Sequence, residues 1–187
     1  MAFEKCKQIN ELMAGFNKDW FFAGGWAIDL FLGKETRDHH DVEIGIYRKD
    51  QVELKRYLST WDFRKVVHGE FLIWGDEFLE LPVHEVHAKK AGGDLEVLLN
   101  ETDGESWIFR RDRRITSPLE SFIRFTEAGL PYLPPEIVLL YKAKNTRDKD
   151  HMDLMSVKEA LESDQLRWLK QAISIHEPTH EWLQVLK

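Results

Sequence analysis

The sequence predicts an α/β fold, of the α+β kind, with a mixed β-sheet flanked by helices and a helical C-terminal region. Three observations predict it. Apolar residues recur at helical spacing near both ends of the chain, runs with the period of a strand fill the middle, and glycines or acidic turns separate those runs. We place the α/β core at residues 1–116 and the helical region, packed on that core, at residues 117–187. A single domain overall is the alternative.

The first third of the chain predicts a helix, a strand and a second helix. Apolar residues at every third or fourth position predict an amphipathic helix over residues 3–16. The apolar run at residues 20–23 is typical of a short buried strand. After the pair Gly24 and Gly25, an apolar segment predicts a helix that starts at the glycines and ends at Gly33.

The middle of the chain predicts mainly strands. Residues 41–47, DVEIGIY, alternate with a period of two. Asp50 and Glu53 have the spacing of a capping box and predict a helix after them. Between residues 62 and 115 the strand-like runs are FRKVV, FLIWG, HEVHAKK, DLEVLL and SWIFRRD.

The last third predicts helices. The segment Ser117-Pro118-Leu119-Glu120 places a cap, a first-turn proline and an acidic third position in order, so a helix is expected from residue 117. From PPEIVLLYKAK to the end the apolar pattern is helical, with a cap expected at Ser163.

The composition is that of an ordered globular protein. The chain has 187 residues, of which 43% are hydrophobic and 12% aromatic, enough for a sizeable core. The N-terminus has no apolar leader segment, and no apolar run reaches the roughly eighteen residues that a membrane span needs. We therefore expect a cytoplasmic protein with no membrane partner. The lone Cys6 is expected to be a small buried hydrophobe rather than a nucleophile.

The net charge of −7 argues against a nucleic-acid partner. A nucleic-acid footprint needs clustered Lys and Arg to displace counterions. A cationic small molecule would suit an acidic surface better.

The Gly24-Gly25 pair stands between an expected strand and an expected helix. Glycines at such a place let backbone N–H groups approach an anion, and the helix N-terminus adds favourable partial charge. A tight strand-to-helix turn without a ligand is the alternative.

Carboxylates are placed where two expected strands could bring them together. Asp41 and Glu43 are two residues apart in one strand, so their side chains would share a face, either as a solvated surface or as a site for Mg²⁺ or Mn²⁺. Glu96 lies between apolar residues of a later strand, where a carboxylate needs a partner. Asp94 shares its face and is the alternative third carboxylate, although a turn role is favoured for it.

These motifs, in this order, resemble the nucleotidyltransferase superfamily of the polymerase-β type. The segment GGWAIDLFLGKETRDHHDVEI narrows the resemblance to the group of aminoglycoside and lincosamide adenylyltransferases. The later segments WIFRRDRRIT, GLPYLPPEIVLLYKAKNTRDKDHMDL and HEPTHEWLQVL resemble the rest of the same group, so the likeness spans nearly the whole chain. It implies a nucleotidyltransferase-type sheet with a C-terminal helical region.

The resemblance also implies roles for the carboxylates. Asp41 and Glu43 resemble the metal-binding pair, and Glu96 the third carboxylate, which serves as a metal ligand or a general base in antibiotic-modifying relatives. The expected metal is Mg²⁺ or Mn²⁺. Glu43 stands where the family more often has Asp, although the superfamily pattern tolerates either acid.

Cationic and backbone groups would hold the nucleotide. Gly24 and Gly25 resemble the phosphate-cradling pair of the family. Lys142 and Lys144 lie where relatives place a cation against the triphosphate. Arg37 matches the segment before the acidic strand and would touch phosphate or order the loop.

The function that the resemblance implies is transfer of a nucleoside monophosphate, from ATP, to a hydroxyl of a small molecule such as an aminoglycoside- or lincosamide-like compound, with release of pyrophosphate. Two alternatives remain open. One is a weakly active or inactive nucleotide-binding domain with a regulatory or interaction role, which the presence of Glu43 keeps open. The other is a relative that transfers AMP to a protein hydroxyl.

Other charged residues receive structural interpretations. His39 is expected to order the loop before the acidic strand, with contact to phosphate as the alternative. His84 and His87 flank a strand without ligand-spaced partners, so a metal role is not expected of them. The cluster RRDRR at residues 110–114 is expected to be solvated surface, with contact to a nucleotide as the alternative.

Overall fold

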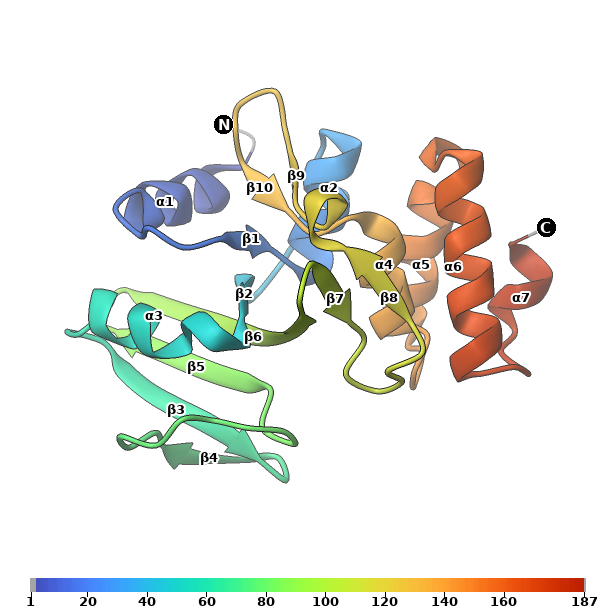
Figure 1. Ribbon diagram of the computed structural model, residues 1–187. Helices are drawn as coiled ribbons and strands as arrows, with labels where there is room; N and C mark the ends of the chain where they lie inside the picture. The colour runs from blue at the N-terminus through green and yellow to red at the C-terminus, as the bar shows by residue number, and fades with distance from the viewer. Residues whose placement is uncertain (1–2, 187) are drawn as a thin grey trace.

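The structure is a computed structural model that describes residues 3–186 and shows a mixed α/β architecture (Figure 1). Its helices are α1 (Glu4–Met13), α2 (Gly24–Leu32), α3 (Gln51–Tyr57), α4 (Pro135–Lys142), α5 (Asp148–Val157), α6 (Ser163–His176) and α7 (Trp182–Val185). Its strands are β1 (Trp20–Phe22), β2 (Glu43–Tyr47), β3 (Asp62–Val67), β4 (Glu70–Ile73), β5 (Glu85–Lys90), β6 (Gly93–Asp103), β7 (Ser106–Ile108), β8 (Thr116–Pro118), β9 (Arg124–Phe125) and β10 (Pro131–Tyr132). The predicted fold class is confirmed.

One mixed sheet organises the molecule. Its strands lie in the order β4-β3-β5-β6-β2-β1-β10-β9, and β7 and β8 continue from β6. The pairs β2–β6 and β1–β10 are parallel, whereas β5–β6 and β1–β2 are antiparallel. Figure 1 shows α4, α5, α6 and α7 gathered on one side of the molecule, with α1 and α3 on the other.

The central strands β2 and β6 have one face in the core and the other toward a cavity. Ile44 and Ile46 of β2 are fully buried, and so is Leu95 of β6. Because side chains alternate along a strand, Glu43 and Glu96 project from the opposite face. Both are only half-buried.

Helix α2 begins directly at the glycine pair, as the sequence predicts. Gly24 has a φ of 57°, which a residue with a Cβ adopts only with strain, and Gly33 ends the helix with a φ of 68°. Apart from Asp29, the residues between Gly25 and Gly33 are apolar and mostly buried, and α2 packs on α4 and α5. Cys6 in α1 is fully buried, and burial raises the pKa of its thiol to about 12, which agrees with a structural role.

The predicted helix from Ser117 is wrong. Residues Thr116–Pro118 form β8, which pairs with β7, and only a 3₁₀ turn at Leu119–Ser121 follows. The Leu119 N–H donates to the Glu105 carbonyl at 2.8 Å, so the backbone is committed to strand pairing despite the local cap pattern. The sheet also takes in β9 and β10, so the helical region begins at α4. The division of the chain at residue 116 remains a prediction.

Two predicted helix caps also differ from the structure. Asp50 ends a 3₁₀ turn before α3, and its side chain makes no cap hydrogen bond. Ser163 is the first residue of α6 rather than its cap. Glu162 and Gln165 form the capping box one residue earlier, with the Glu162 N–H donating to Gln165 Oε1 at 3.0 Å.

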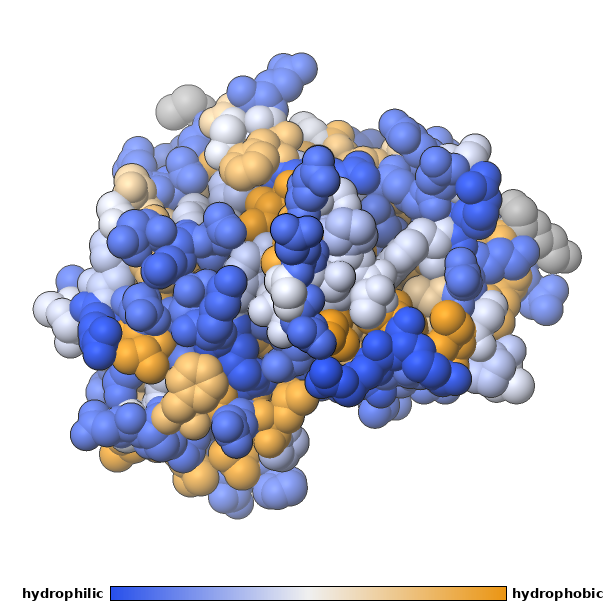
Figure 2. Space-filling model, in the orientation of Figure 1, coloured by the Kyte–Doolittle hydropathy of each residue, from blue (hydrophilic) through white to orange (hydrophobic). Residues whose placement is uncertain are grey.

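Strand β4 forms one edge of the sheet and carries exposed apolar side chains. Phe71 is 50% exposed and Ile73 is 77% exposed. Figure 2 shows apolar side chains over the region that β3 and β4 occupy in Figure 1.

Within residues 3–186, no helix is both long and apolar enough to cross a bilayer.

Candidate functional site

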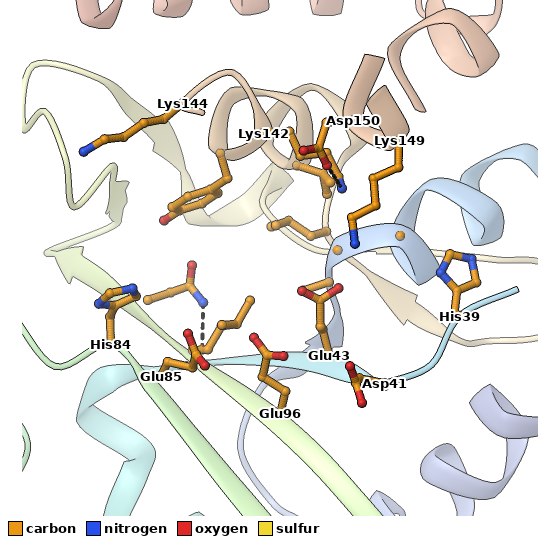
Figure 3. A pocket seen from close by; sticks show the side chains of 18 of the residues that line it. His39, Asp41, Glu43, His84, Glu85, Glu96, Lys142, Lys144, Lys149 and Asp150 are labelled. Carbon is orange, nitrogen blue, oxygen red and sulfur yellow. Dashed lines mark hydrogen bonds and ion pairs between the residues drawn. The ribbon is translucent and has the colours of Figure 1, made fainter. Parts of the chain in front are cut away.

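A cavity of about 590 Å³ opens above β2 and β6, beside the first turn of α2 and below α4 and α5 (Figure 3). Every site residue predicted from the sequence lines it. These residues are Gly24, Gly25, Arg37, Asp41, Glu43, Glu96, Lys142 and Lys144. The structure therefore brings the predicted set into one place.

Glu43 and Glu96 are direct neighbours on paired strands. They are register partners in the parallel pairing of β2 with β6, so their carboxylates rise side by side into the cavity. Asp41 differs from the prediction, because it lies before β2 rather than in it and is exposed. Figure 3 shows its carboxylate directed differently from that of Glu43.

The glycine pair leaves space for the groups around it. A Cβ on Gly24 would overlap the Glu43 carboxylate, and a Cβ on Gly25 would overlap the Arg37 guanidinium and the His39 ring. The first bond of α2 runs from the Ala27 N–H to the Ala23 carbonyl at 3.2 Å. The N–H groups before it lack an intrahelical partner, so this turn can donate to an anion.

The loop between α2 and β2 is held by contacts that fix the backbone of Asp41. Trp26 Nε1 donates to the Asp41 carbonyl at 3.0 Å, and the Trp26 ring packs on that of His39 with centroids 4.5 Å apart. His39 Nε2 lies 2.7 Å from Asp29 Oδ2. Burial would raise the pKa of Asp29, but hydrogen bonds from His39 and Thr36 lower it overall. His39 thus orders this loop, as expected.

Lys142 lies in a buried ion network rather than standing free. Its Nζ is 2.9 Å from Asp150 Oδ1 and 3.0 Å from Asp153 Oδ2. Arg147 Nε also contacts Asp150, at 2.8 Å, and Arg37 Nε contacts Asp153 at 3.4 Å. This network ties α5 to the end of α4 and to the loop before β2.

Replacing Asp150 by Asn is expected to weaken the acid dependence of stability. Burial would raise the pKa of Asp150, but hydrogen bonds from Arg147 and Lys142 lower it to about 2, against the ordinary 3.8. A lowered folded-state pKa stabilises the protein above pH 3.8 and loses that contribution as the pH falls toward about 2. The melting-temperature gap between wild type and Asp150→Asn should therefore shrink over that range. The exposed Asp148→Asn is the matched control, and a gap that stays constant would contradict the assignment.

Sequence reasoning missed Lys149, which also lines the cavity. Figure 3 shows its side chain reaching down toward the start of α2 and the Glu43 carboxylate. Among residues 3–186 it forms no ion pair, unlike Lys142. In the sequence, the spacing of Lys149, Asp150 and Asp153 on one helical face predicts only a local salt-bridge cluster.

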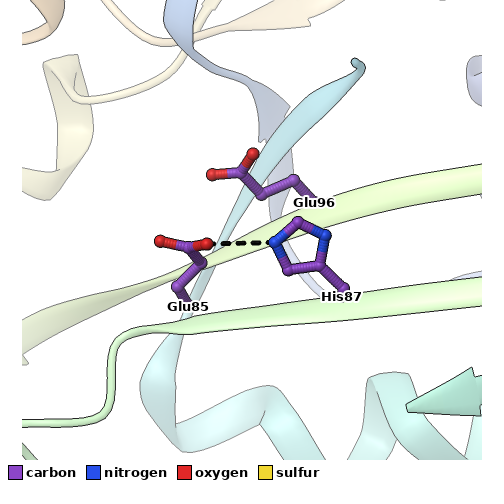
Figure 4. Close-up of side chains that lie close together, drawn as sticks. All are labelled: Glu85, His87 and Glu96. Carbon is purple, nitrogen blue, oxygen red and sulfur yellow. Dashed lines mark hydrogen bonds and ion pairs between the residues drawn. The ribbon is translucent and has the colours of Figure 1, made fainter. Parts of the chain in front are cut away.

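Strand β5 contributes Glu85 and His87, which the sequence did not assign to the site. His87 is the register partner of Glu96, and its Nε2 lies 3.0 Å from Glu85 Oε1 (Figure 4). Ligand atoms of Glu85, His87 and Glu96 all lie within 4.8 Å of one another. The expectation that His87 has no ligand-spaced partners is wrong, since these partners come from cross-strand pairing. His84 lines the cavity nearby, and its Nδ1 lies 2.8 Å from the Pro82 carbonyl.

Burial and the neighbouring carboxylates disfavour ionisation of Glu96. Burial raises the pKa of Glu96 to about 8, and the charges of Glu43, Glu85 and Asp41 add to the rise. All of these donors are hard oxygen atoms, which suit Mg²⁺ or Mn²⁺. The donor set therefore fits a divalent cation.

Asp94 does not belong to this set. It is exposed, and its Oδ2 pairs with Lys89 Nζ at 2.8 Å on the surface of the sheet. Of the two candidates for the third carboxylate, only Glu96 lines the cavity.

The cluster at residues 110–114 is divided between cavity and surface. Arg110 and Arg111 line the cavity, so the expectation of solvated surface is wrong for them. Arg113 and Arg114 are exposed, and Arg114 Nη2 pairs with Asp112 at 2.6 Å. The run of charges in the sequence gave no sign of this division.

Sequence comparisons relate the chain to antibiotic-modifying enzymes. A family model described as aminoglycoside-2''-adenylyltransferase matches residues 5–157. A lincosamide resistance protein of Staphylococcus haemolyticus is 21% identical over 154 residues, which cover 80% of this chain and 90% of that protein.

Solved structures share the fold. The lincosamide antibiotic adenylyltransferase LnuA, with lincomycin bound, superposes with a TM-score of 0.60 at 20% identity and covers 86% of this chain and 99% of LnuA. The complex of ANT(2'')-Ia with adenylyl-2''-tobramycin gives 0.62 at 15% identity and covers 91% of this chain and 98% of that one.

Proposed function

Because the chain belongs to the aminoglycoside-2''-adenylyltransferase family, we propose that it transfers AMP from ATP to a hydroxyl of a small molecule and releases pyrophosphate. The acceptor is a compound of the aminoglycoside or lincosamide kind. One observation carries the proposal: Glu43 and Glu96 are register partners beside the Gly24-Gly25 turn, in a single cavity that also holds Asp41. The cytoplasm, which supplies ATP, is the proposed location.

Asp41, Glu43 and Glu96 would hold Mg²⁺ or Mn²⁺. The bound ion would supply neutralisation of the charge on the reacting phosphates. Asp41 is exposed, and an exposed side chain changes rotamer within nanoseconds, so its carboxylate can turn toward Glu43.

The rest of the cavity binds and orients the nucleotide. The free N–H groups of the Gly24-Gly25 turn donate to phosphate oxygens, and Lys149 adds a positive charge beside them. Lys142 and Arg37 act through their network, which fixes α5 against this turn. Lys144 is exposed at the cavity rim and can reach the nucleotide or the acceptor.

Glu96 is also placed to accept a proton. This role is the alternative to metal ligation and requires an ionised carboxylate. Burial and the neighbouring carboxylates raise the pKa of Glu96, and a cation held by Asp41 and Glu43 would oppose that rise. Glu85, held by His87, lies next to it on β5 and keeps the neighbouring wall acidic.

A pyrophosphate-release assay tests the proposal. The protein is incubated with each NTP, Mg²⁺ and a panel of aminoglycosides and lincosamides, and pyrophosphate and orthophosphate are measured separately. We expect pyrophosphate release that requires both an acceptor and the metal, with ATP the best substrate. Release of orthophosphate instead would mean attack at the γ-phosphorus and would contradict nucleotidyl transfer.

A nucleotide-binding domain without transferase activity is the second candidate. The observation that favours it is the direction of the Asp41 carboxylate, which differs from that of Glu43. ATP binding without pyrophosphate release from any acceptor, including protein hydroxyls, would favour this candidate over the first.

A further inference from the structure

One end of the cavity carries two arginine side chains. Arg110 and Arg111 line it, next to His84, and both are half-buried. Within the described part of the chain neither guanidinium forms an ion pair. Arg111 Nη1 donates to the Tyr141 carbonyl at 2.8 Å, which leaves most of its donors unused.

The guanidinium groups are held in place by an aromatic ring. Arg110 and Arg111 lie 5.6 Å and 5.4 Å from the centroid of the Tyr141 ring, and Arg111 also lies 6.0 Å from that of Phe109. Tyr141 belongs to α4, so the arginines are fixed against a helix rather than extended into solvent.

The partial burial of these arginines makes their charged forms less favourable than they would be in water. Burial lowers the pKa of both guanidinium groups. At Arg110 the charge of Arg111 adds to this effect, whereas Tyr141 and the charge of Glu85 oppose it without reversing it. Burial also lowers the pKa of His84, and the charge of Arg110 adds to this effect. A second cation brought to this wall would therefore meet repulsion at close range and in a partly desolvated setting.

The cavity is thus divided by charge. The carboxylates of Glu43 and Glu96 stand on β2 and β6, whereas the arginines stand beyond β6, where the chain leaves β7. The overall charge of −7 does not describe this end of the cavity. The expectation of a cationic ligand, drawn from net charge, has no support here.

We propose that Arg110 and Arg111 are specificity-determining residues, which admit an acceptor that presents an uncharged or anionic face and reject a polycationic one. Of the two acceptor kinds in the proposed function, this selects the lincosamide-like kind over the aminoglycoside-like kind. The inference rests on the proposed function, which puts the phosphates at the Gly24-Gly25 turn after β1. The arginines follow β7 on the β6 side of the carboxylates, and we assign that opposite end of the cavity to the acceptor. Like-charge contact at an interface discriminates between ligands of similar shape. Arg110 carries the larger effect because, among residues 3–186, it has neither a hydrogen bond nor an ion pair to the protein.

Binding of tobramycin, which carries several amino groups, tests the inference. Its Kd is measured by calorimetry at low ionic strength for wild type, Arg110→Glu, Arg110→Gln and the control Arg113→Glu. Arg113 is an exposed neighbour that does not line the cavity, so its reversal changes the net charge equally. We expect Arg110→Glu to bind tobramycin at least about tenfold tighter than wild type and Arg113→Glu, with Arg110→Gln between them. Lincomycin, which has a single amine, should respond less, by about threefold at most.

The outcomes separate this inference from the proposed function. Circular dichroism confirms that each variant is folded, and ATP binding with Mg²⁺ is measured on all of them. If no protein binds ATP, the proposed function fails, and the inference falls with it. If ATP binds but tobramycin affinity is unchanged or absent in Arg110→Glu, or rises equally in Arg113→Glu, the inference alone is overturned.

Discussion

Replacing Asp41 by Asn is expected to lower the rate of nucleotidyl transfer by about a thousandfold or more while leaving the fold intact. Asn keeps the shape of the side chain but removes the charge that would hold a divalent cation beside Glu43. Asp41 is exposed and its backbone carbonyl still accepts from Trp26, so stability should change by less than about 0.5 kcal/mol. Pyrophosphate release and the melting temperature are measured together.

Asp38→Asn is the matched control for this variant. Asp38 is an exposed carboxylate in the same loop and does not line the cavity. Its variant should keep wild-type activity. Full activity in Asp41→Asn, or an equal loss in both variants, would remove Asp41 from the metal-binding set.

Gly24→Ala is expected to damage the site far more than Gly33→Ala. Both glycines have a positive φ, so either substitution costs about 1 kcal/mol of backbone strain. At Gly33 an added Cβ meets open space, whereas at Gly24 it overlaps the Glu43 carboxylate. Displacing Glu43 should lower the rate by about a hundredfold, because a small misplacement of a catalytic group costs that much.

The comparison of the two alanine variants isolates the overlap from the strain. Their melting temperatures show the backbone cost, and pyrophosphate release shows the effect on the site. Gly33→Ala should retain wild-type activity. If both variants lose activity alike, backbone strain alone explains why glycine is needed at these two positions. The contact between residue 24 and Glu43 would then have no effect on function.

The same contact bears on the unusual acid at position 43. Glu43 stands where the resembled family more often has Asp, and its carboxylate lies where the Cβ of residue 24 would otherwise be. Gly24 therefore provides the room that the longer side chain needs. Sequence alone shows both residues but not that one makes space for the other.

Local sequence patterns predicted much of the fold. The regular alternation of side chains along a strand predicted that Glu43 and Glu96 would both face the site. Alternation along β2 and β6 placed Glu43 and Glu96 on the face opposite the core, and the glycine pair marked the start of α2. Asp41 was placed correctly at the cavity but wrongly inside the strand. These successes depend on signals carried within a few residues.

Long-range pairing decided what the sequence could not predict. Glu85 and His87 join Glu96 only because β5 pairs with β6 in one register, and a shift by one residue would turn both away. The cap pattern at Ser117 predicted a helix, but pairing of β8 with β7 prevailed there. Arg110 and Arg111 reach the cavity because Tyr141 of α4 packs against them, a contact between distant segments.

Titration of ATP into the protein, with and without Mg²⁺, tests the central claim most directly, because it needs no knowledge of the acceptor. The claim is that Asp41, Glu43 and Glu96 form a metal-dependent nucleotide site. It predicts that Mg²⁺ tightens ATP binding to the wild type by at least about tenfold and does so far less in Asp41→Asn. ATP binding that is absent, or that is indifferent to both Mg²⁺ and the loss of the Asp41 charge, would contradict it.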